Sequence, residues 1–169
     1  MFDKLRRGRA DLATMNELFP AAERAAHADG LDEPGAEHLL LAALDLGDGI
    51  AKATLSSLGV DAAALRAAIA DQHDEALRAV GVIADDGALA AALPAHGESR
   101  GPYRSQGSLQ VAFQRAVALA KDAASPLDSG HVLLAVAEPD RGTLARAFER
   151  LGVDRTVLRH RLAGERAAG

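Results

Sequence analysis

The sequence predicts an all-α protein in which two tandem four-helix repeats pack about a pseudo-twofold axis. The first indication is an internal repeat. His38-Leu39-Leu40-Leu41-Ala42 returns as His131-Val132-Leu133-Leu134-Ala135, and Leu58-Gly59-Val60-Asp61 returns as Leu151-Gly152-Val153-Asp154, both at an offset of 93 residues (131 minus 38). The second indication is composition, because alanine is abundant and no alternating apolar and polar run indicates a strand. Repeats of this kind bury their apolar faces against each other and are typical of binding scaffolds.

The bulk composition limits the function classes. The 169 residues carry a formal net charge of −5 and 3% aromatic residues, so neither charge nor base stacking favours a nucleic-acid partner. The chain has no cysteine, which excludes disulfides and cysteine-ligated zinc and is typical of a reducing compartment. The start lacks the apolar segment of a secretory signal, and no apolar run approaches the roughly 18 residues of a membrane span. We therefore expect a cytoplasmic protein with no membrane partner.

The first repeat is predicted over residues 14–80, after a basic N-terminal arm at 1–13. Thr14-Met15-Asn16-Glu17 has the form of a capping box, so the first helix is expected to begin there. Pro20 is unfavourable inside a helix, which makes it an alternative start or a kink, and Gly30 ends the segment. The other helices of this repeat are predicted over 34–47, 49–58 and 62–80.

A linker is predicted over 81–107, where Asp86 can cap a short helix that ends at Leu93. The second repeat is predicted over 108–163, and a frayed tail over 164–169. The helices of the second repeat are predicted over 109–124, 130–137, 141–151 and 155–162.

Each repeat contributes one glycine and one aspartate to the structural signature at its helix boundaries. Gly59 and Gly152 are predicted to end a helix in the left-handed conformation that glycine adopts readily. Asp61 and Asp154 follow them and are predicted to cap the next helix.

The repeated motifs resemble those of one known family. The first copy reads Gly35-Ala36-Glu37-His38-Leu39-Leu40-Leu41, Gly49 and Leu58-Gly59-Val60-Asp61. The second copy reads Ser129-Gly130-His131-Val132-Leu133-Leu134, Gly142 and Leu151-Gly152-Val153-Asp154. Two such copies in register resemble the N-terminal Clp repeat domain of Clp/Hsp100 unfoldases of the ClpC type. The sequence contains no Gly-Lys pair of a phosphate loop, so a stand-alone relative without ATPase modules is expected.

This resemblance implies a non-catalytic module that binds protein or peptide ligands and acts as an adaptor or regulator of Clp-dependent proteolysis. Its implied partners are Clp ATPase or protease subunits and, in ClpC-type domains, arginine-phosphorylated proteins. Glu37 occupies the position whose carboxylate helps to bind phosphoarginine in that family, whereas its counterpart in the second repeat is Gly130. The alternative is a soluble decoy that sequesters tagged clients, or small peptides or antibiotics that target Clp.

The aromatic residues, the repeated histidines and one apolar stripe are each interpreted as either binding or structural. Phe2 and Tyr103 would be natural binding anchors if they are exposed together. His38 and His131 recur beside apolar faces, which favours a structural role over a ligand or proton-shuttle role. A helical stripe is interpreted as core, and it consists of Leu109, Val111, Phe113, Ala116 and Val117.

No metal, cofactor or catalytic site is expected. The histidines and carboxylates outside the repeat signature lack the His-Glu-x-x-His spacing of a zinc site, and Ser129 is better interpreted as a helix cap than as a nucleophile. These candidates are His27, His73-Asp74-Glu75 and His96. A helical hydrolase or a nucleic-acid regulator is therefore the least favoured function class.

Overall fold

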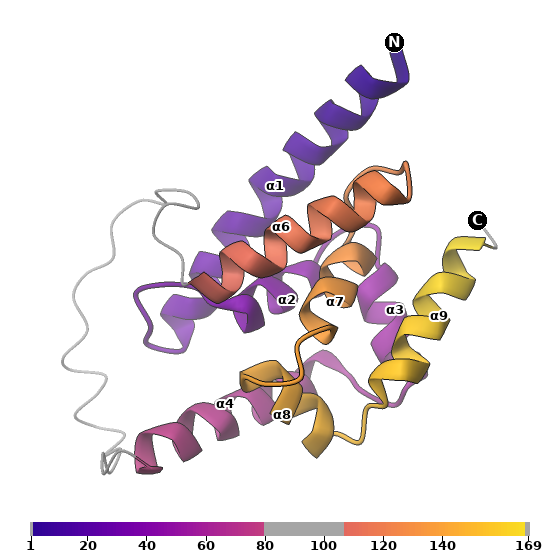
Figure 1. Cartoon of the computed structure of the whole chain (residues 1–169). Coiled ribbons are helices and arrows are strands. Elements are labelled where there is room, and N and C mark those ends of the chain that lie inside the picture. Colours follow the sequence, from indigo (N-terminus) through magenta and orange to yellow (C-terminus); the bar gives the residue numbers. More distant parts are fainter. Residues whose placement is uncertain (1, 80–106, 168–169) are drawn as a thin grey trace.

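The structure, a computed structural model, describes residues 2–79 and 107–167, and these form eight helices and no strand (Figure 1). The prediction of an all-α fold is confirmed. The helices are α1 (Phe2–Ala28), α2 (Ala36–Leu44), α3 (Ile50–Ser57), α4 (Ala62–Ala79), α6 (Gly107–Asp122), α7 (Ser129–Ala137), α8 (Thr143–Arg150) and α9 (Arg155–Ala167).

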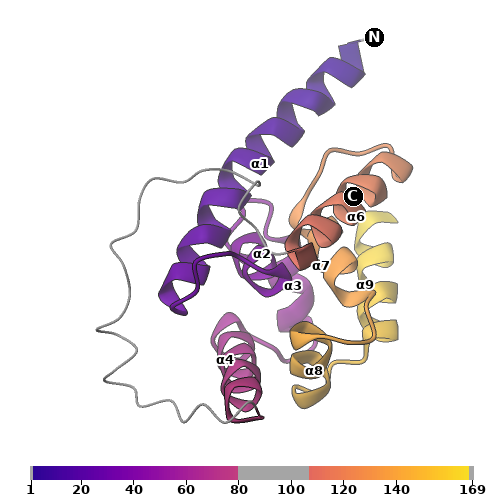
Figure 2. The ribbon, with the colours of Figure 1, turned by 60° about the vertical axis from the view of Figure 1, so that its left-hand side comes forward.

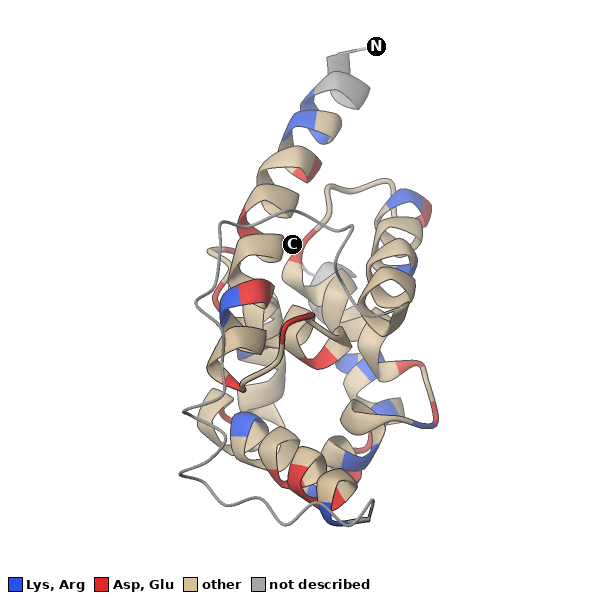
Figure 3. Cartoon of the chain, turned by 90° about the vertical axis from the view of Figure 1, so that its left-hand side faces the viewer, with Lys and Arg blue, Asp and Glu red and all other residues tan. Residues whose placement is uncertain are grey.

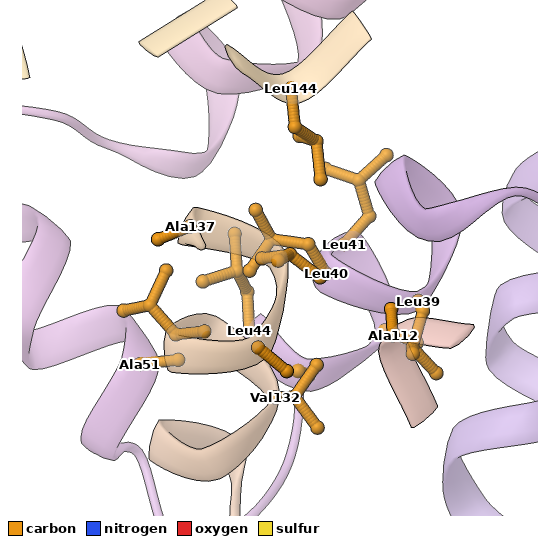
Figure 4. Packing of buried hydrophobic residues seen from close by; sticks show 14 of the residues in the cluster. Leu39, Leu40, Leu41, Leu44, Ala51, Ala112, Val132, Ala137 and Leu144 are labelled. Carbon is orange, nitrogen blue, oxygen red and sulfur yellow. The ribbon is translucent and has the colours of Figure 1, made fainter. Parts of the chain in front are cut away.

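The repeated His-Leu-Leu segments form the two central helices. Every residue of α2 from Glu37 to Leu44 is buried, and α7 is buried almost throughout. A helix that is apolar on all sides needs neighbours on all sides, and α2 and α7 supply one another with such a neighbour. Figure 4 shows α6, α3 and α8 completing the core around them through Ala112, Ala51 and Leu144.

The two repeats interlock. Helix α4 of the first repeat packs against α8 of the second, and α9 of the second repeat packs against α3 of the first (Figure 2). Arg150 of α8 also forms ion pairs with Asp71 (2.9 Å) and Glu75 (3.3 Å) of α4. These groups are about half exposed, so packing stabilises the interface more than charge does. Each repeat therefore needs the other to bury its apolar face.

The structure places the signature residues at helix boundaries. Gly59 and Gly152 follow α3 and α8 with φ of +78° and +68°, which a side chain would strain. Asp61 Oδ1 accepts a hydrogen bond from the Ala64 N–H (2.7 Å), and Asp154 Oδ1 accepts one from the Thr156 N–H (2.7 Å).

Helix α1 differs from the prediction. It begins at Phe2 and continues through Pro20, so the predicted helix start at Thr14 or at Pro20 is wrong. The buried side chains Leu18 and Phe19 before the proline and Ala22 after it share one packed face. Burial of this face outweighs the hydrogen bond that proline cannot donate.

The outer part of α1 extends past the other helices and is tied to the α6–α7 loop (Figure 1). Asp11 Oδ1 accepts a hydrogen bond from the Leu127 N–H (2.7 Å), and Arg7 donates one to the Ala124 carbonyl (3.0 Å). Figure 3 shows Lys and Arg residues on the outer turns of α1, whereas basic and acidic residues are mixed over the rest of the side that faces the viewer. The residues interpreted as a separate basic arm are therefore part of a helix.

The remaining differences lie at the ends of elements. Helix α9 continues to Ala167, so residues 164–167 are helical and not part of a frayed tail. The short helix predicted from Asp86 to Leu93 falls outside the described residues.

Candidate functional site

Glu37 lies in the first turn of α2 and is buried, with 6% of its surface exposed. Its Oε1 is 3.4 Å from Nε2 of His73 on α4 and 3.7 Å from Nδ1 of His38. A β-carbon on Gly35 would lie 2.7 Å from both Glu37 carboxylate oxygens, which is closer than atoms can approach. The absence of a side chain at Gly35 therefore gives the carboxylate its place against the helix N-terminus.

His38 closes the N-terminus of α2. It is fully buried, and its Nδ1 accepts a hydrogen bond from the Gly35 N–H (2.9 Å), the group that a glutamate accepts from in a capping box. Because Nδ1 is an acceptor, the ring proton is on Nε2, which lies 3.1 Å from Asp29 Oδ2 and donates to it.

His131 has the same arrangement at the N-terminus of α7. Its Nδ1 is 3.2 Å from the Asp128 N–H, and its Nε2 is 3.4 Å from Ser125 Oγ. It is also fully buried. Two histidines that repeat the same cap in two buried helix starts perform a structural task, and neither reaches a surface where it could bind a ligand.

The pKa values of Glu37, His38 and His73 depend on one another because the three side chains lie close together. Burial opposes ionisation of Glu37, but hydrogen bonds from His73 and from its own backbone N–H lower its pKa below the ordinary value. The hydrogen bond to Glu37 raises the pKa of His73. Burial lowers the pKa of His38 despite the nearby carboxylates of Glu37 and Asp29. Near neutral pH the three side chains therefore include an ionised Glu37 and a neutral His38.

Substitution of Gly35 by alanine is expected to displace the Glu37 carboxylate and to lower the pKa of His73 toward its ordinary value. A raised histidine pKa stabilises the fold below about pH 6.5, and this contribution is lost as the pH rises through the raised pKa. The variant should therefore lose more stability at about pH 6 than at about pH 9. An NMR titration of the His73 imidazole, combined with unfolding at both pH values, measures these effects.

Gly47→Ala is the matched control, because a β-carbon at Gly47 has open space around it. An unchanged His73 titration in Gly35→Ala would show that the Glu37 carboxylate does not set the charge of this imidazole.

Beside this turn lies a cleft of about 600 Å³, which we name the α2–α8 cleft. Its walls come from the starts of α2, α6 and α8 and from the end of α7. The lining is mostly apolar, and the lining residues that matter below are Glu37, Val111, Arg115, Glu138, Arg141 and Leu144. Val111 is 66% exposed, more than the other exposed large apolar side chains that the structure describes, Leu12 (59%), Val117 (41%) and Val157 (41%).

Two arginines border the cleft and differ in their partners. Arg115 makes a two-pronged ion pair with Glu138, with Nε–Oε2 of 2.6 Å and Nη2–Oε1 of 2.7 Å. Arg141 is exposed, and no acidic side chain within the described residues pairs with it. The cleft therefore combines an apolar floor with one cation that is not neutralised by its described neighbours.

The structure brings together only part of the predicted site. Tyr103 and the side chain of Phe2 fall outside the described residues. The interpretation of the α6 stripe as core is wrong for Val111 and for Val117, which is 41% exposed. Buried α6 residues are spaced by three or four, as Leu109, Ala112, Ala116 and Ala120 are, and this spacing would have separated both valines from the core.

Arg115 and Arg141 were missed by the sequence reasoning. Arg141 could have been found from the repeat register, since the offset of 93 residues aligns it with Asp48, a residue of opposite charge. No comparable signal was available for Arg115, because its place beside the cleft depends on how α6 and α7 pack.

No group of three His, Cys, Asp or Glu side chains within residues 2–79 and 107–167 is arranged to hold a metal ion. In the same residues no single helix is long and apolar enough to cross a membrane. Helices α3 and α4 reach that length and hydropathy only together, and they are bent by 84° at the break between them.

Comparisons with known proteins agree with the sequence motifs. A family model for the Clp repeat (R) N-terminal domain matches residues 13–125, which is more than half of the chain. No curated protein matches the sequence. The N-terminal domain of the caseinolytic protease associated chaperone ClpD from Arabidopsis thaliana superposes with a TM-score of 0.63 at 20% identity, covering 92% of this chain and 93% of that one. A chain studied as part of a malarial protein secretion system superposes with a TM-score of 0.60 at 16% identity, covering 90% and 92%. The protein belongs to the Clp repeat N-terminal domain family.

Proposed function

We propose that the protein is a non-catalytic docking module that binds protein or peptide segments in the α2–α8 cleft and acts as an adaptor or regulator of Clp-dependent proteolysis. The observation that carries this proposal is an apolar cleft with an exposed Val111, built where the two repeats of a Clp N-terminal fold meet. Apolar clefts with a few placed polar groups are the usual form of a binding site.

The interlocked repeats suit this role. The cleft walls come from both repeats, so folding of the whole chain positions them before any ligand binds. A preformed cleft spends little free energy on ordering when a flexible peptide docks. Its partners would be Clp ATPase or protease subunits, or proteins delivered to them.

A pull-down from cell lysate with the parent protein and with Val111→Arg as baits tests the proposal. Val117→Arg is the control, because Val117 is an exposed valine of the same helix that does not line the cleft. Quantitative mass spectrometry should show Clp ATPase or protease subunits with the parent and with Val117→Arg, but not with Val111→Arg. Clp subunits that Val111→Arg retains, or their absence from every bait, would contradict the proposal.

The second candidate function is a decoy that sequesters arginine-phosphorylated clients. It is favoured by the place of Glu37, a lining residue of the cleft whose carboxylate could hold a guanidinium in place of the His73 imidazole. This exchange has a cost, since the carboxylate is already hydrogen-bonded and nearly enclosed.

Titration with a phosphoarginine peptide tests this candidate. The parent should bind, whereas Glu37→Gln, which keeps the side-chain volume but not the charge, should bind at least about tenfold more weakly. Equal affinity of the parent and of both Glu37→Gln and Glu37→Ala would exclude a role for this carboxylate. In lysate, the decoy predicts scattered client proteins without Clp subunits.

A further inference from the structure

The junction between α3 and α7 is closed by the protein's own carboxylate. Asp48 Oδ1 accepts a hydrogen bond from the Ile50 N–H (3.0 Å), and Oδ2 accepts one from the Ser129 N–H (2.9 Å). The Ser129 hydroxyl also donates to Asp48 and accepts from the Ala51 N–H (2.9 Å). One acidic side chain thus holds the starts of two helices from different repeats.

The repeat register identifies the matching junction on the other side of the molecule. At an offset of 93 residues Asp48 corresponds to Arg141, Ile50 to Thr143, and Ala36 to Ser129. Arg141, Thr143 and Ala36 all line the α2–α8 cleft. The two junctions are therefore counterparts in the repeat register, one closed by the Asp48 carboxylate and the other with an arginine at the aligned position beside the cleft.

The other charges of the open junction are already matched. Glu138 is paired with Arg115, and Glu37 is hydrogen-bonded to His73. Asp140, the neighbour of Arg141, is paired with Arg155 (2.9 Å). Arg141 is exposed, so its guanidinium is the group here that lacks a counter-charge among the described residues.

We propose that the α2–α8 cleft selects acidic peptide segments, in which a Glu or Asp side chain pairs with Arg141 and an adjacent apolar side chain packs on Val111. The peptide carboxylate supplies the counter-charge at this junction, where the Ala36 N–H already donates to the Ser108 hydroxyl (3.3 Å) and no described acidic side chain pairs with Arg141. Arginine grips a carboxylate through two parallel hydrogen bonds, which gives the cleft charge selectivity in addition to apolar affinity. This inference rests on the proposed docking function and adds its ligand class.

Fluorescence anisotropy with two short labelled peptides tests the inference, one composed of leucine and glutamate and the other of leucine and glutamine. The parent should bind the glutamate peptide at least about tenfold more tightly than the glutamine peptide. Arg141→Ala should remove this preference. Arg146→Ala, an exposed arginine of α8 that does not line the cleft, should retain it.

Arg141→Asp provides a test that needs no ligand. An aspartate at this position should accept a hydrogen bond from the Thr143 N–H at the start of α8, as Asp48 does from the Ile50 N–H of α3, so the variant should have a higher Tm than Arg141→Ala and should reject the glutamate peptide.

The failure of this inference is distinguishable from failure of the docking function. Equal binding of both peptides, abolished by Val111→Arg, would overturn acidic selectivity and leave peptide docking in place. Binding of neither peptide would also overturn the inference, while the lysate experiment decides the docking function separately. A preference for the glutamate peptide that persists in Arg141→Ala would show that Arg141 does not provide the charge selectivity.

Discussion

Replacement of His38 by alanine is expected to lower the free energy of unfolding by about 3 kcal/mol. The imidazole is fully buried, so its loss leaves a cavity beside the start of α2. It also leaves the Gly35 N–H and the Asp29 carboxylate without the partners that the ring provides. A buried donor without an acceptor costs more than the hydrogen bond contributes when formed. Urea unfolding followed by circular dichroism measures the change.

His38→Gln separates the effect of losing the hydrogen bond to Gly35 from the effect of leaving a cavity. Glutamine at the third helical position can accept from the Gly35 N–H, as it does in a capping box, and it fills part of the volume. We expect this variant to lose about 1 kcal/mol, clearly less than His38→Ala. Equal losses would mean that the hydrogen bond to Gly35 contributes nothing. A loss below about 1 kcal/mol in His38→Ala would contradict the structural role of this histidine.

Asp48→Ala is expected to destabilise the fold by about 2 kcal/mol, although Asp48 itself is exposed. Its carboxylate accepts from the Ile50 N–H of α3 and the Ser129 N–H of α7, so one substitution leaves two helix-start N–H groups without this acceptor. Because α3 and α7 belong to different repeats, the substitution should also lower the cooperativity of unfolding. Chemical unfolding of the parent and of Asp48→Ala measures both the free energy and the cooperativity.

Asp48→Asn keeps one carbonyl acceptor and should lose about half as much. A double-mutant cycle with Ser129→Ala isolates the contact, and we expect a coupling free energy of about 1 kcal/mol. Additive losses would show that the two side chains act independently and would weaken the comparison between the junctions.

The repeat itself was predictable because it depends on burial. A segment such as His38-Leu39-Leu40-Leu41 has no polar face, so it must lie at the centre of the fold, and its second copy must do the same. The helix boundaries after α3 and α8 were predictable for local reasons, since glycine with positive φ and a following aspartate cap act within one turn.

The start of α1 could not be predicted from local signals. Thr14 and Pro20 both favour a helix boundary, yet the helix passes through them. Phe19 packs on Phe113 of α6, with ring centroids 4.9 Å apart, and Thr14 donates to the Leu127 carbonyl (3.2 Å). These contacts are more than 90 residues distant in sequence, so local propensity carries no information about them.

The candidate site was only partly predictable for the same reason. The motif identified Glu37, but the burial of its carboxylate depends on His73 of α4, which no spacing rule connects to α2. The exposed Val111 and Arg141, which no described side chain pairs with, become a site only when the start of α2 from the first repeat packs beside α6 and α8 of the second. The contrast between Asp48 and Arg141 was present in the sequence, but its meaning required the geometry of the two junctions.

The central claim is that one of the two junctions is closed by Asp48 and that the other is an open docking cleft. Amide chemical-shift mapping of the isotope-labelled protein during titration with the leucine–glutamate peptide tests it most directly. Shifts are expected at Ala36, Val111, Arg141 and Thr143, and none at Ala51 or Ser129. Shifts confined to the basic outer part of α1, or equal shifts at both junctions, would contradict it.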